Sequence, residues 1–280
     1  MIPPPVAELH AAIQASRNRL TSRTSVSPDA ARLDRLLARM QARLAAPPRV
    51  VLLGDFNSGK STLANALIGA QALPTSIHAN TRVPLHARFA SHPSVSLELL
   101  DGSRTPLDER NYKHLQNGSV RMLHVAMPVS RLSTFELIDT PGLASGASRP
   151  DALVVDASKR AHVAVWCTAA TQAWKATEAA AWSELPARLR PRSILVATLA
   201  DALNTDRDRT RLETRLRAEA GRYFADVVMV SAAEVDALRR NPQATGHAER
   251  WVACGGAALD AALQRLLDNE WASRAISTER

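Results

Sequence analysis

The 280-residue chain has few cysteines, few aromatic residues and no long apolar run, and each shortage argues against a class of protein. Its two cysteines, Cys167 and Cys254, have neither pairing nor metal-ligand spacing, which indicates a reducing compartment. Aromatic residues make up 4% of the chain, too few for a surface that stacks single-stranded bases. No apolar run reaches the ~18 residues that cross a bilayer, and the N-terminus shows no signal-peptide pattern. We therefore expect a cytoplasmic protein without a transmembrane segment.

The chain does have a globular composition and a basic N-terminal part. Hydrophobic residues make up 46% and charged residues 22%, which is enough for a core of one large domain or two small ones. Residues 1–49 carry eight arginines, no lysine and three acidic residues, within a net charge of +8 for the whole chain. Such a segment attracts anionic phospholipid, RNA or an acidic protein, or it is a solvated helix face. Peripheral contact with an anionic membrane, at its inner face, is one prediction for these helices.

Residues 1–48 are expected to form a helical hairpin and residues 236–280 a C-terminal helical segment, and the two segments are expected to pack as a small bundle. Apolar residues at helical spacing predict a first helix from Val6 to Leu20. Ser27 and Pro28 start a second helix as N-cap and first-turn residue. The second helix has an apolar stripe with a basic stripe beside it. The apolar stripe comprises Leu33, Leu36, Leu37, Met40 and Leu44, and the basic stripe comprises Arg32, Arg35, Arg39 and Arg43.

Residues 49–235 have the pattern of an α/β domain. Short apolar stretches, among them residues 50–53, 162–167 and 193–198, alternate with helical stretches. This order predicts a mostly parallel central sheet with helices on both faces.

The stretch "GDFNSGKS", from Gly54 to Ser61, fits the phosphate-loop pattern G-x-x-x-x-G-K-(S/T) between a predicted strand and a predicted helix. Gly54 and Gly59 allow backbone conformations that point N–H groups at phosphate oxygens, and the helix N-terminus adds positive charge. Lys60 is expected to bridge the β- and γ-phosphates, and the Ser61 hydroxyl to ligate Mg²⁺. The predicted fold is therefore that of a P-loop NTPase.

Two further motifs follow in the order that a GTPase needs. "LIDTPG" ends another strand, and there Asp139 can hold Mg²⁺ through a water while the backbone of Gly142 senses the γ-phosphate. "TLAD", from Thr198 to Asp201, has the form (N/T)-K-x-D with Leu199 in place of lysine.

The carboxylate of Asp201 can accept two N–H bonds from guanine, for which adenine offers no matching donor pair. Leu199 can keep the apolar cover of the base, but it loses the amine that would brace the phosphate loop. We expect weaker binding and faster exchange with base choice preserved.

These residues resemble the GTPase domain of the dynamin superfamily, in its bacterial dynamin-like branch, over roughly residues 49–235. The resemblance is carried by the phosphate loop running into "NALIG" and "LPTS", and by "HANTRVPL", "DTPGL" and "WCTAATQAWKATE". It implies a GTPase whose switches respond to the γ-phosphate, often by pairing two GTPase domains across the nucleotide. Thr81 resembles the switch threonine that contacts Mg²⁺ and the γ-phosphate, with Thr75 as the competing candidate. "VSA" resembles the last nucleotide motif, in which the backbone N–H of Ala232, after Ser231, meets the guanine carbonyl.

The predicted site follows from the motifs and the resemblance together. The catalytic residues are Lys60, Thr81 and Asn57, and the Mg²⁺ ligands are Ser61, Thr81 and Asp139. The contacts to GTP or GDP are Gly54, Asn57, Ser58, Gly59, Lys60, Ser61, Thr62, Gly142, Thr198, Asp201, Ser231 and Ala232.

The chain departs from the family pattern at several positions. Phe56 and Asn57 stand where animal dynamins have a Gln-Ser pair, and of these two only Asn57 can donate a hydrogen bond from its side chain. Leu143 stands where small signalling GTPases place a water-orienting glutamine, which dynamins also lack. We therefore expect slow hydrolysis unless a second copy of the GTPase domain or a partner protein completes the site. Residues 236–280 are too few for the family's long stalk and membrane tip, so membrane remodelling is not predicted.

The leading hypothesis is a Mg²⁺-dependent GTP-binding and GTP-hydrolysing switch of the dynamin-like type. Three alternatives remain at this point: a P-loop ATPase, an Era-like GTPase associated with ribosome or RNA, and a degenerate nucleotide-binding scaffold.

Overall fold

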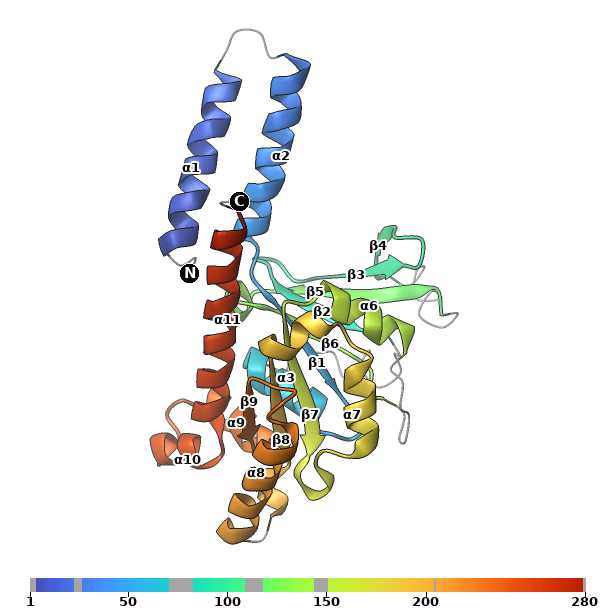
Figure 1. Ribbon diagram of the computed structural model, residues 1–280, viewed down its shortest axis with the longest axis vertical. Helices are drawn as coiled ribbons and strands as arrows, with labels where there is room; N and C mark the ends of the chain where they lie inside the picture. The colour runs from blue at the N-terminus through green and yellow to red at the C-terminus, as the bar shows by residue number, and fades with distance from the viewer. Residues whose placement is uncertain are drawn as a thin grey trace.

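The structure, a computed structural model, describes residues 4–22, 27–70, 83–108, 118–143, 151–203 and 205–278. A nine-stranded sheet forms its centre, with strand order β4-β3-β5-β2-β6-β1-β7-β8-β9 (Figure 1). The strands are β1 Arg49–Gly54, β2 Leu85–Phe89, β3 Ser94–Leu99, β4 Arg104–Pro106, β5 Val120–Met127, β6 Glu136–Asp139, β7 Val163–Ala169, β8 Ser193–Thr198 and β9 Asp226–Met229. The predicted mostly parallel sheet is confirmed.

Helices cover both faces of this sheet, and a helical arm extends from it (Figure 1). The α-helices are α1 Pro4–Thr21, α2 Pro28–Ala45, α3 Lys60–Ile68, α6 Ala152–Arg160, α7 Ala176–Ser183, α8 Asp206–Ala220, α9 Ala232–Arg240, α10 His247–Ala253 and α11 Gly256–Thr278. Four short 3-10 helices join them: η1 Ser130–Ser133, η2 Ala170–Gln172, η3 Ala187–Arg192 and η4 Ala200–Ala202.

Alternation along β1 shows why the sheet is buried on both faces. Val50 and Leu52 join one core cluster with residues of α3, α9 and α11. Val51 and Leu53 point the other way, into a second cluster with residues of α6, α7 and α8. All four side chains are buried, as expected for a parallel strand with helices on both sides.

The position of β1 in the sheet places the predicted phosphate loop. β1 runs parallel to β6 on one side and to β7 on the other, and β7, β8 and β9 continue in the same direction. The chain therefore turns to opposite sides of β1 in successive crossovers. Ligands bind in open α/β sheets at such a switch point, beyond the carboxyl ends of the strands.

One half of the sheet differs from the simple alternating order. β2 pairs with β6 in antiparallel fashion, and β3 pairs antiparallel with both β5 and β4. The three-residue strand β4 and the helix α6 are elements that the sequence pattern did not predict.

The helical arm consists of α1, α2 and the far end of α11. Val6 and Ile13 of α1, Leu44 of α2 and Trp271 of α11 form its small core. The near end of α11 instead packs on the sheet, with Leu259 and other apolar residues in the larger core cluster. The predicted packing of N- and C-terminal helices is thus confirmed, while the division of the chain after residues 48 and 235 stays a prediction.

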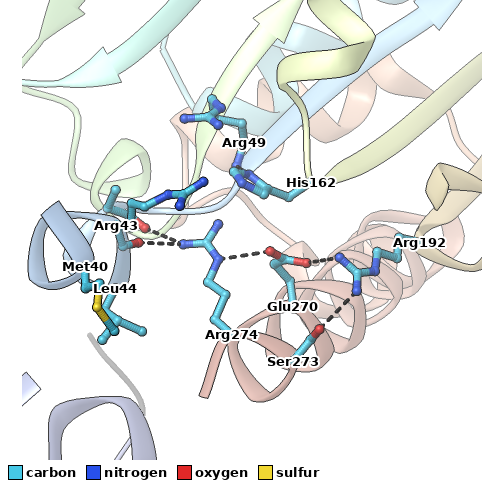
Figure 2. Close-up of a pocket in the computed structure, with 10 residues that line it drawn as sticks. Met40, Arg43, Leu44, Arg49, His162, Arg192, Glu270, Ser273 and Arg274 are labelled. Atoms are coloured by element: carbon cyan, nitrogen blue, oxygen red, sulfur yellow. Dashed lines mark hydrogen bonds and ion pairs between the residues drawn. The ribbon is translucent and has the colours of Figure 1, made fainter. Parts of the chain in front are cut away.

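Ion pairs and hydrogen bonds hold the arm at its junction with the sheet (Figure 2). Glu270 of α11 accepts from Arg192, at the end of η3, at 2.5 Å and from Arg274 at 2.9 Å. Arg274 also donates to the carbonyl of Ala46 at 2.7 Å, just beyond α2. One buried carboxylate therefore links α11 to the start of β8 and, through Arg274, to the end of α2.

The helix α2 begins as predicted but buries less than predicted. Ser27 caps it by accepting from the backbone N–H of Ala30, and Pro28 is its first residue. Of the five apolar stripe residues only Leu44 is buried, and Leu37 is partly buried against the arm's core. The other three, Leu33, Leu36 and Met40, are exposed because α1 covers only one side of α2. Among the described residues, no helix is long and apolar enough to cross a bilayer.

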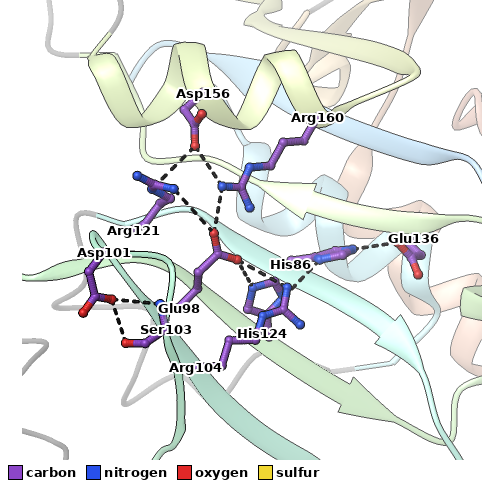
Figure 3. A network of polar contacts seen from close by, with 10 residues as sticks. All are labelled: His86, Glu98, Asp101, Ser103, Arg104, Arg121, His124, Glu136, Asp156 and Arg160. Carbon is purple, nitrogen blue, oxygen red and sulfur yellow. Dashed lines mark hydrogen bonds and ion pairs between the residues drawn. The ribbon is translucent and has the colours of Figure 1, made fainter.

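Two histidines and two glutamates form a chain of contacts across the sheet (Figure 3). The Nδ1 atoms of His86 and His124 lie 3.2 Å apart. The Nε2 of His86 contacts Glu136 and the Nε2 of His124 contacts Glu98, each at 2.9 Å. Arg160 donates to the other oxygen of Glu98 at 2.7 Å. The network joins β2, β3, β5 and β6 to α6.

Burial and hydrogen bonding shift two pKa values in this network in the same direction. Burial lowers the pKa of His124 to about 4, despite the hydrogen bond to Glu98 that favours its protonation. Burial opposes ionisation of Glu98, but hydrogen bonds from Arg160 and His124 bring its pKa down to about 2.

We expect the free energy of unfolding to fall as the pH is lowered from about 6.5 to about 4. In that range the unfolded chain protonates His124 while the folded chain does not, so each pH unit costs up to about 1.4 kcal/mol. His162, with a pKa lowered to about 3 by burial and neighbouring arginines, contributes with the same sign. Urea unfolding at several pH values measures the slope, and His124→Gln should reduce it by about half. His92→Gln, at an exposed position, is the control; an unchanged slope in His124→Gln would contradict the assignment.

Candidate functional site

The phosphate loop joins β1 to α3, and two glycines set its shape. Gly54 ends β1 with φ 137°, and a Cβ there would lie 2.1 Å from the carbonyl oxygen of Cys167 in β7. Gly59 precedes α3 with φ 75°, and a Cβ there would lie 3.1 Å from the hydroxyl of Thr198. Only glycine combines these backbone angles with such close neighbours. The loop is therefore fixed against the ends of β7 and β8.

Lys60, the first residue of α3, folds its side chain back over the loop. Its Nζ donates to the carbonyls of Gly54 at 3.0 Å and Asp55 at 2.7 Å, and it is 7% exposed. Burial lowers the pKa of Lys60, although Cys167, Asp139 and Asp55 act in the opposite direction. A buried ammonium held by neutral carbonyls is a strong site for an anion such as phosphate.

The segment after β6 is hydrogen-bonded to the phosphate loop. Phe56 N donates to the carbonyl of Leu143 at 3.0 Å, and Leu143 N donates to that of Gly54 at 3.1 Å. Between them, a Cβ on Gly142 would lie 2.8 Å from Phe56 Cα and 3.1 Å from Lys60 Nζ. The structure thus brings the "GDFNSGKS" and "DTPG" motifs into direct contact, with no room for a side chain at Gly142.

The predicted Mg²⁺ ligands fit the chemistry of that ion where they are described. Asp139, at the end of β6, is 3% exposed. It lies near enough to Lys60 for its charge to oppose the lowering of the Lys60 pKa by burial. Ser61 is the second residue of α3, and its side chain is exposed. Mg²⁺ takes oxygen ligands and keeps several waters, so one carboxylate and one hydroxyl suffice from the protein. Thr81, the third predicted ligand, and Thr75 lie outside the described residues.

The other predicted loop residues occupy varied positions. Asn57 is exposed with φ 61°, a left-handed conformation that asparagine tolerates. Ser58 is buried, and its backbone carbonyl accepts from the hydroxyl of Thr198 at 2.5 Å. Thr62, in the first turn of α3, is exposed.

The predicted guanine motifs adjoin each other at the ends of β8 and β9. Ala200 N donates to the carbonyl of Val230 at 3.3 Å, which joins the loop after β8 to the loop after β9. Ser231 and Ala232 are buried there, with Ala232 as the first residue of α9, where backbone N–H groups have no partner within the helix. Asp201 lies in η4 and is exposed. The arrangement leaves its carboxylate accessible to a base.

Leu199 occupies the place that the lysine of the pattern would hold. It is 41% exposed and has φ 55°, a left-handed conformation that is unusual for leucine. Its side chain lines a cavity of about 190 Å³ together with the loop residues Asp55, Phe56, Asn57 and Ser58. The leucine therefore lies beside the phosphate loop without an amine that could bond to it.

The structure adds a polar cluster that sequence reasoning missed, in which Asp55 and Glu178 are buried and Lys175 is exposed. Lys175 Nζ pairs with Asp55 at 3.1 Å. Glu178, 1% exposed in α7, accepts from Trp166 Nε1 and Thr168 Oγ1, each at 3.0 Å. Burial raises the pKa of Glu178, against these hydrogen bonds.

A single acid within the apolar run "ATEAAAW" was the only sequence signal for this cluster. Asp55 and Lys175 are too far apart in the chain for any spacing rule to pair them. Their contact places a positive charge beside the phosphate loop in addition to Lys60.

Comparisons with known proteins agree with this geometry. The family model described as Dynamin family matches residues 50–200. "Dynamin-like protein 2" of Campylobacter jejuni is 29% identical over 191 residues, which cover 66% of this chain and 31% of that protein. "Isoniazid-induced protein IniC" of Mycobacterium tuberculosis is 34% identical over 161 residues, covering 55% of this chain and 30% of that protein. The chain thus spans about a third of the length of these relatives.

A solved structure shares the fold over most of the chain. It comes from an oligomerised bacterial dynamin pair, for which long-range sensing and tethering of membranes is described. It aligns with a TM-score of 0.55 over 92% of this chain and 41% of that one, at 21% sequence identity.

Proposed function

We propose a function for this chain from the premise that it belongs to the dynamin family, whose model matches residues 50–200. The chain is a GTP-binding switch that hydrolyses GTP with Mg²⁺. Lys60 and the backbone of the loop hold the phosphates, Ser61, Asp139 and Thr81 hold the ion, and Asp201 reads guanine. Mg²⁺ held by these residues would neutralise phosphate charge, while Lys60 and the backbone of the loop orient the phosphates for attack by water.

One observation carries this proposal: the phosphate loop and the segment after β6 are joined through Leu143 and packed at Gly142. A γ-phosphate beside Lys60 would meet the backbone of Gly142, so its presence or loss would move the segment after β6. This coupling is what a switch requires, whereas a static nucleotide-binding scaffold has no need of it.

Hydrolysis is expected to be slow in the isolated chain. Asn57 is an exposed loop residue whose side chain can hydrogen-bond to water, and Leu143 stands where small signalling GTPases have a glutamine. We propose that a second GTPase domain of the same kind, or a partner protein, completes the site. The oligomerised pair among the solved structures supports this proposal.

The proposed location is cytoplasmic, with peripheral contact to an anionic membrane through the helical arm. The exposed Leu33, Leu36 and Met40 of α2 lie beside its arginines, which is the composition of an interfacial helix. The membrane-tethering dynamin pair that shares the fold supports this proposal.

Base choice tests the proposed function. We expect GTP and GDP, titrated as fluorescent analogues with Mg²⁺, to bind more tightly than ATP, and Asp201→Asn to lower the affinity for GTP roughly tenfold or more while leaving that for ATP unchanged. The reason is that the amide nitrogen of asparagine presents a donor to a guanine N–H. Asp206→Asn, which removes an exposed carboxylate from the first turn of α8, is the matched control. Equal affinities of the wild type for GTP and ATP would contradict the proposal.

A further inference from the structure

A second cavity lies at the N-terminal ends of the central strands, whereas the phosphate loop lies at their C-terminal ends. The helical arm meets the core at this cavity (Figure 2). Its volume is about 680 Å³, within the range of small-molecule sites. Arg49, His162 and Arg192 line it from the N-terminal ends of β1, β7 and β8. The length of β1, about 20 Å, lies between Arg49 and the phosphate loop, so the two sites are distinct.

Arginine dominates the charge of this cavity. Four arginines line it, and among the described residues Glu270 is the one carboxylate that does. Both oxygens of Glu270 are already in ion pairs, one with Arg192 and one with Arg274. Within the described residues, no carboxylate forms an ion pair with Arg43 or Arg49, the other two arginines. The cavity therefore has a surplus of positive charge.

Arg49 is held so that its remaining N–H groups can act as donors. Its Nε donates to the carbonyl of Arg160 at 2.6 Å. Burial lowers the pKa of Arg49, the charge of Glu136 opposes this, and nearby arginines add to the lowering. Its backbone N–H donates to Nδ1 of His162 at 2.9 Å, which leaves Nε2 as the N–H of a neutral ring. Arginine and a neutral imidazole N–H both donate to phosphate oxygens.

The other wall of the cavity is apolar. Met40, Leu44 and Ala46 line it from α2 and the residue that follows it, and Arg43 lies on the same helix. Inorganic phosphate would leave this wall and most of the volume unfilled. A ligand that fits both walls has a phosphate group and an apolar body.

We propose that this cavity binds a phosphate ester, with its phosphate on Arg43, Arg49 and His162 and its apolar part against Met40 and Leu44. The ligand would contact α2, α11 and the N-terminal ends of β1 and β7, and it would fix the helical arm relative to the core. The phosphate group can belong to a soluble phosphate ester or to a phospholipid headgroup.

Binding of pyrophosphate and of vesicles distinguishes the two sources. Titration calorimetry with inorganic pyrophosphate is done on Lys60→Ala protein, which lacks the main phosphate ligand of the nucleotide site. Co-sedimentation uses vesicles of phosphatidylcholine with and without phosphatidate. Arg43→Gln and Arg49→Gln are each expected to weaken binding about tenfold.

The control is a double variant that also removes two arginines, but from positions outside the cavity. Arg35 and Arg39 lie on α2 but do not line the cavity, so Arg35→Gln with Arg39→Gln removes the same charge as Arg43→Gln with Arg49→Gln. Arg43 is exposed, so Arg43→Gln is expected to fold normally.

Each outcome decides the proposal. The cavity variant carries both Arg43→Gln and Arg49→Gln. Pyrophosphate binding that is weakened in this variant but not in the control supports a soluble phosphate ester. Sedimentation with phosphatidate vesicles that only the cavity variant loses supports a lipid headgroup. No binding to either probe, or equal loss in the Arg35 and Arg39 control, overturns the proposal.

Discussion

Lys60→Ala is expected to lower the affinity for GTP roughly a hundredfold or more, and hydrolysis with it. Lys60 Nζ is the buried ammonium of the phosphate loop and is held over it by the carbonyls of Gly54 and Asp55. Fluorescent GTP titration and phosphate release measure the two effects.

The same substitution should change stability by less than about 1 kcal/mol, because it leaves no carbonyl unpaired. The carbonyl of Gly54 also accepts from Leu143 N, and that of Asp55 from Ser58 N. Urea unfolding measures this in the absence of nucleotide. Lys159→Ala, at an exposed position in the last turn of α6, is the control for lost charge. If Lys60→Ala binds GTP as tightly as Lys159→Ala does, the assignment of Lys60 is wrong.

Gly54→Ala is expected to destabilise the fold by about 3 kcal/mol or more. The added Cβ would lie 2.1 Å from the carbonyl oxygen of Cys167, and both residues belong to paired central strands that cannot separate. The backbone angle φ of 137° adds strain for any residue other than glycine. Chemical denaturation gives the change in the free energy of unfolding.

Gly102→Ala separates the two causes of this effect. Gly102 has φ 87°, but no atom lies within 4 Å of where its Cβ would be. Alanine there should cost only about 1 kcal/mol, from the backbone alone. Similar losses for the two variants would show that the contact with Cys167 relaxes, and the fixed position of the loop would then be in doubt.

Local signals predicted the centre of the fold well. The apolar stretch before Gly54 and the helix after Lys60 are adjacent in sequence, so one motif specifies strand, loop and helix together. Ser27 and Pro28 mark the start of α2 for the same reason, because a cap acts within one turn. The alternation of short apolar stretches with helical stretches along the chain predicted the mostly parallel sheet.

Contacts between distant segments could not be predicted in this way. The sequence of β2 does not show the direction of its neighbours: β2 runs parallel to β5 and antiparallel to β6. The pair of Asp55 with Lys175 depends on how β7 ends next to β1. The stripe of α2 predicts burial by its period, but how much of it is covered depends on where α1 lies.

The arginine cavity shows the same limit more clearly. Arg43, Arg49, His162 and Arg192 belong to four separate segments, and no stretch of sequence contains a recognisable basic pocket. The helical spacing of α2 places Arg43 in a solvent-exposed basic stripe. Arg43 joins Arg49 and Arg192 in one cavity only because α2 lies against the N-terminal ends of three strands.

The helix α11 gives the molecule a mechanical property. With 23 residues it is about 35 Å long, and it is anchored at one end on the sheet beside β9 and at the other on α1. Its apolar residues from Leu259 to Leu267 pack in the sheet core, and Glu270 pairs with Arg192 just before β8. One continuous helix therefore sets the angle that α1 and α2 make with the sheet, and acts as a support for the helical arm.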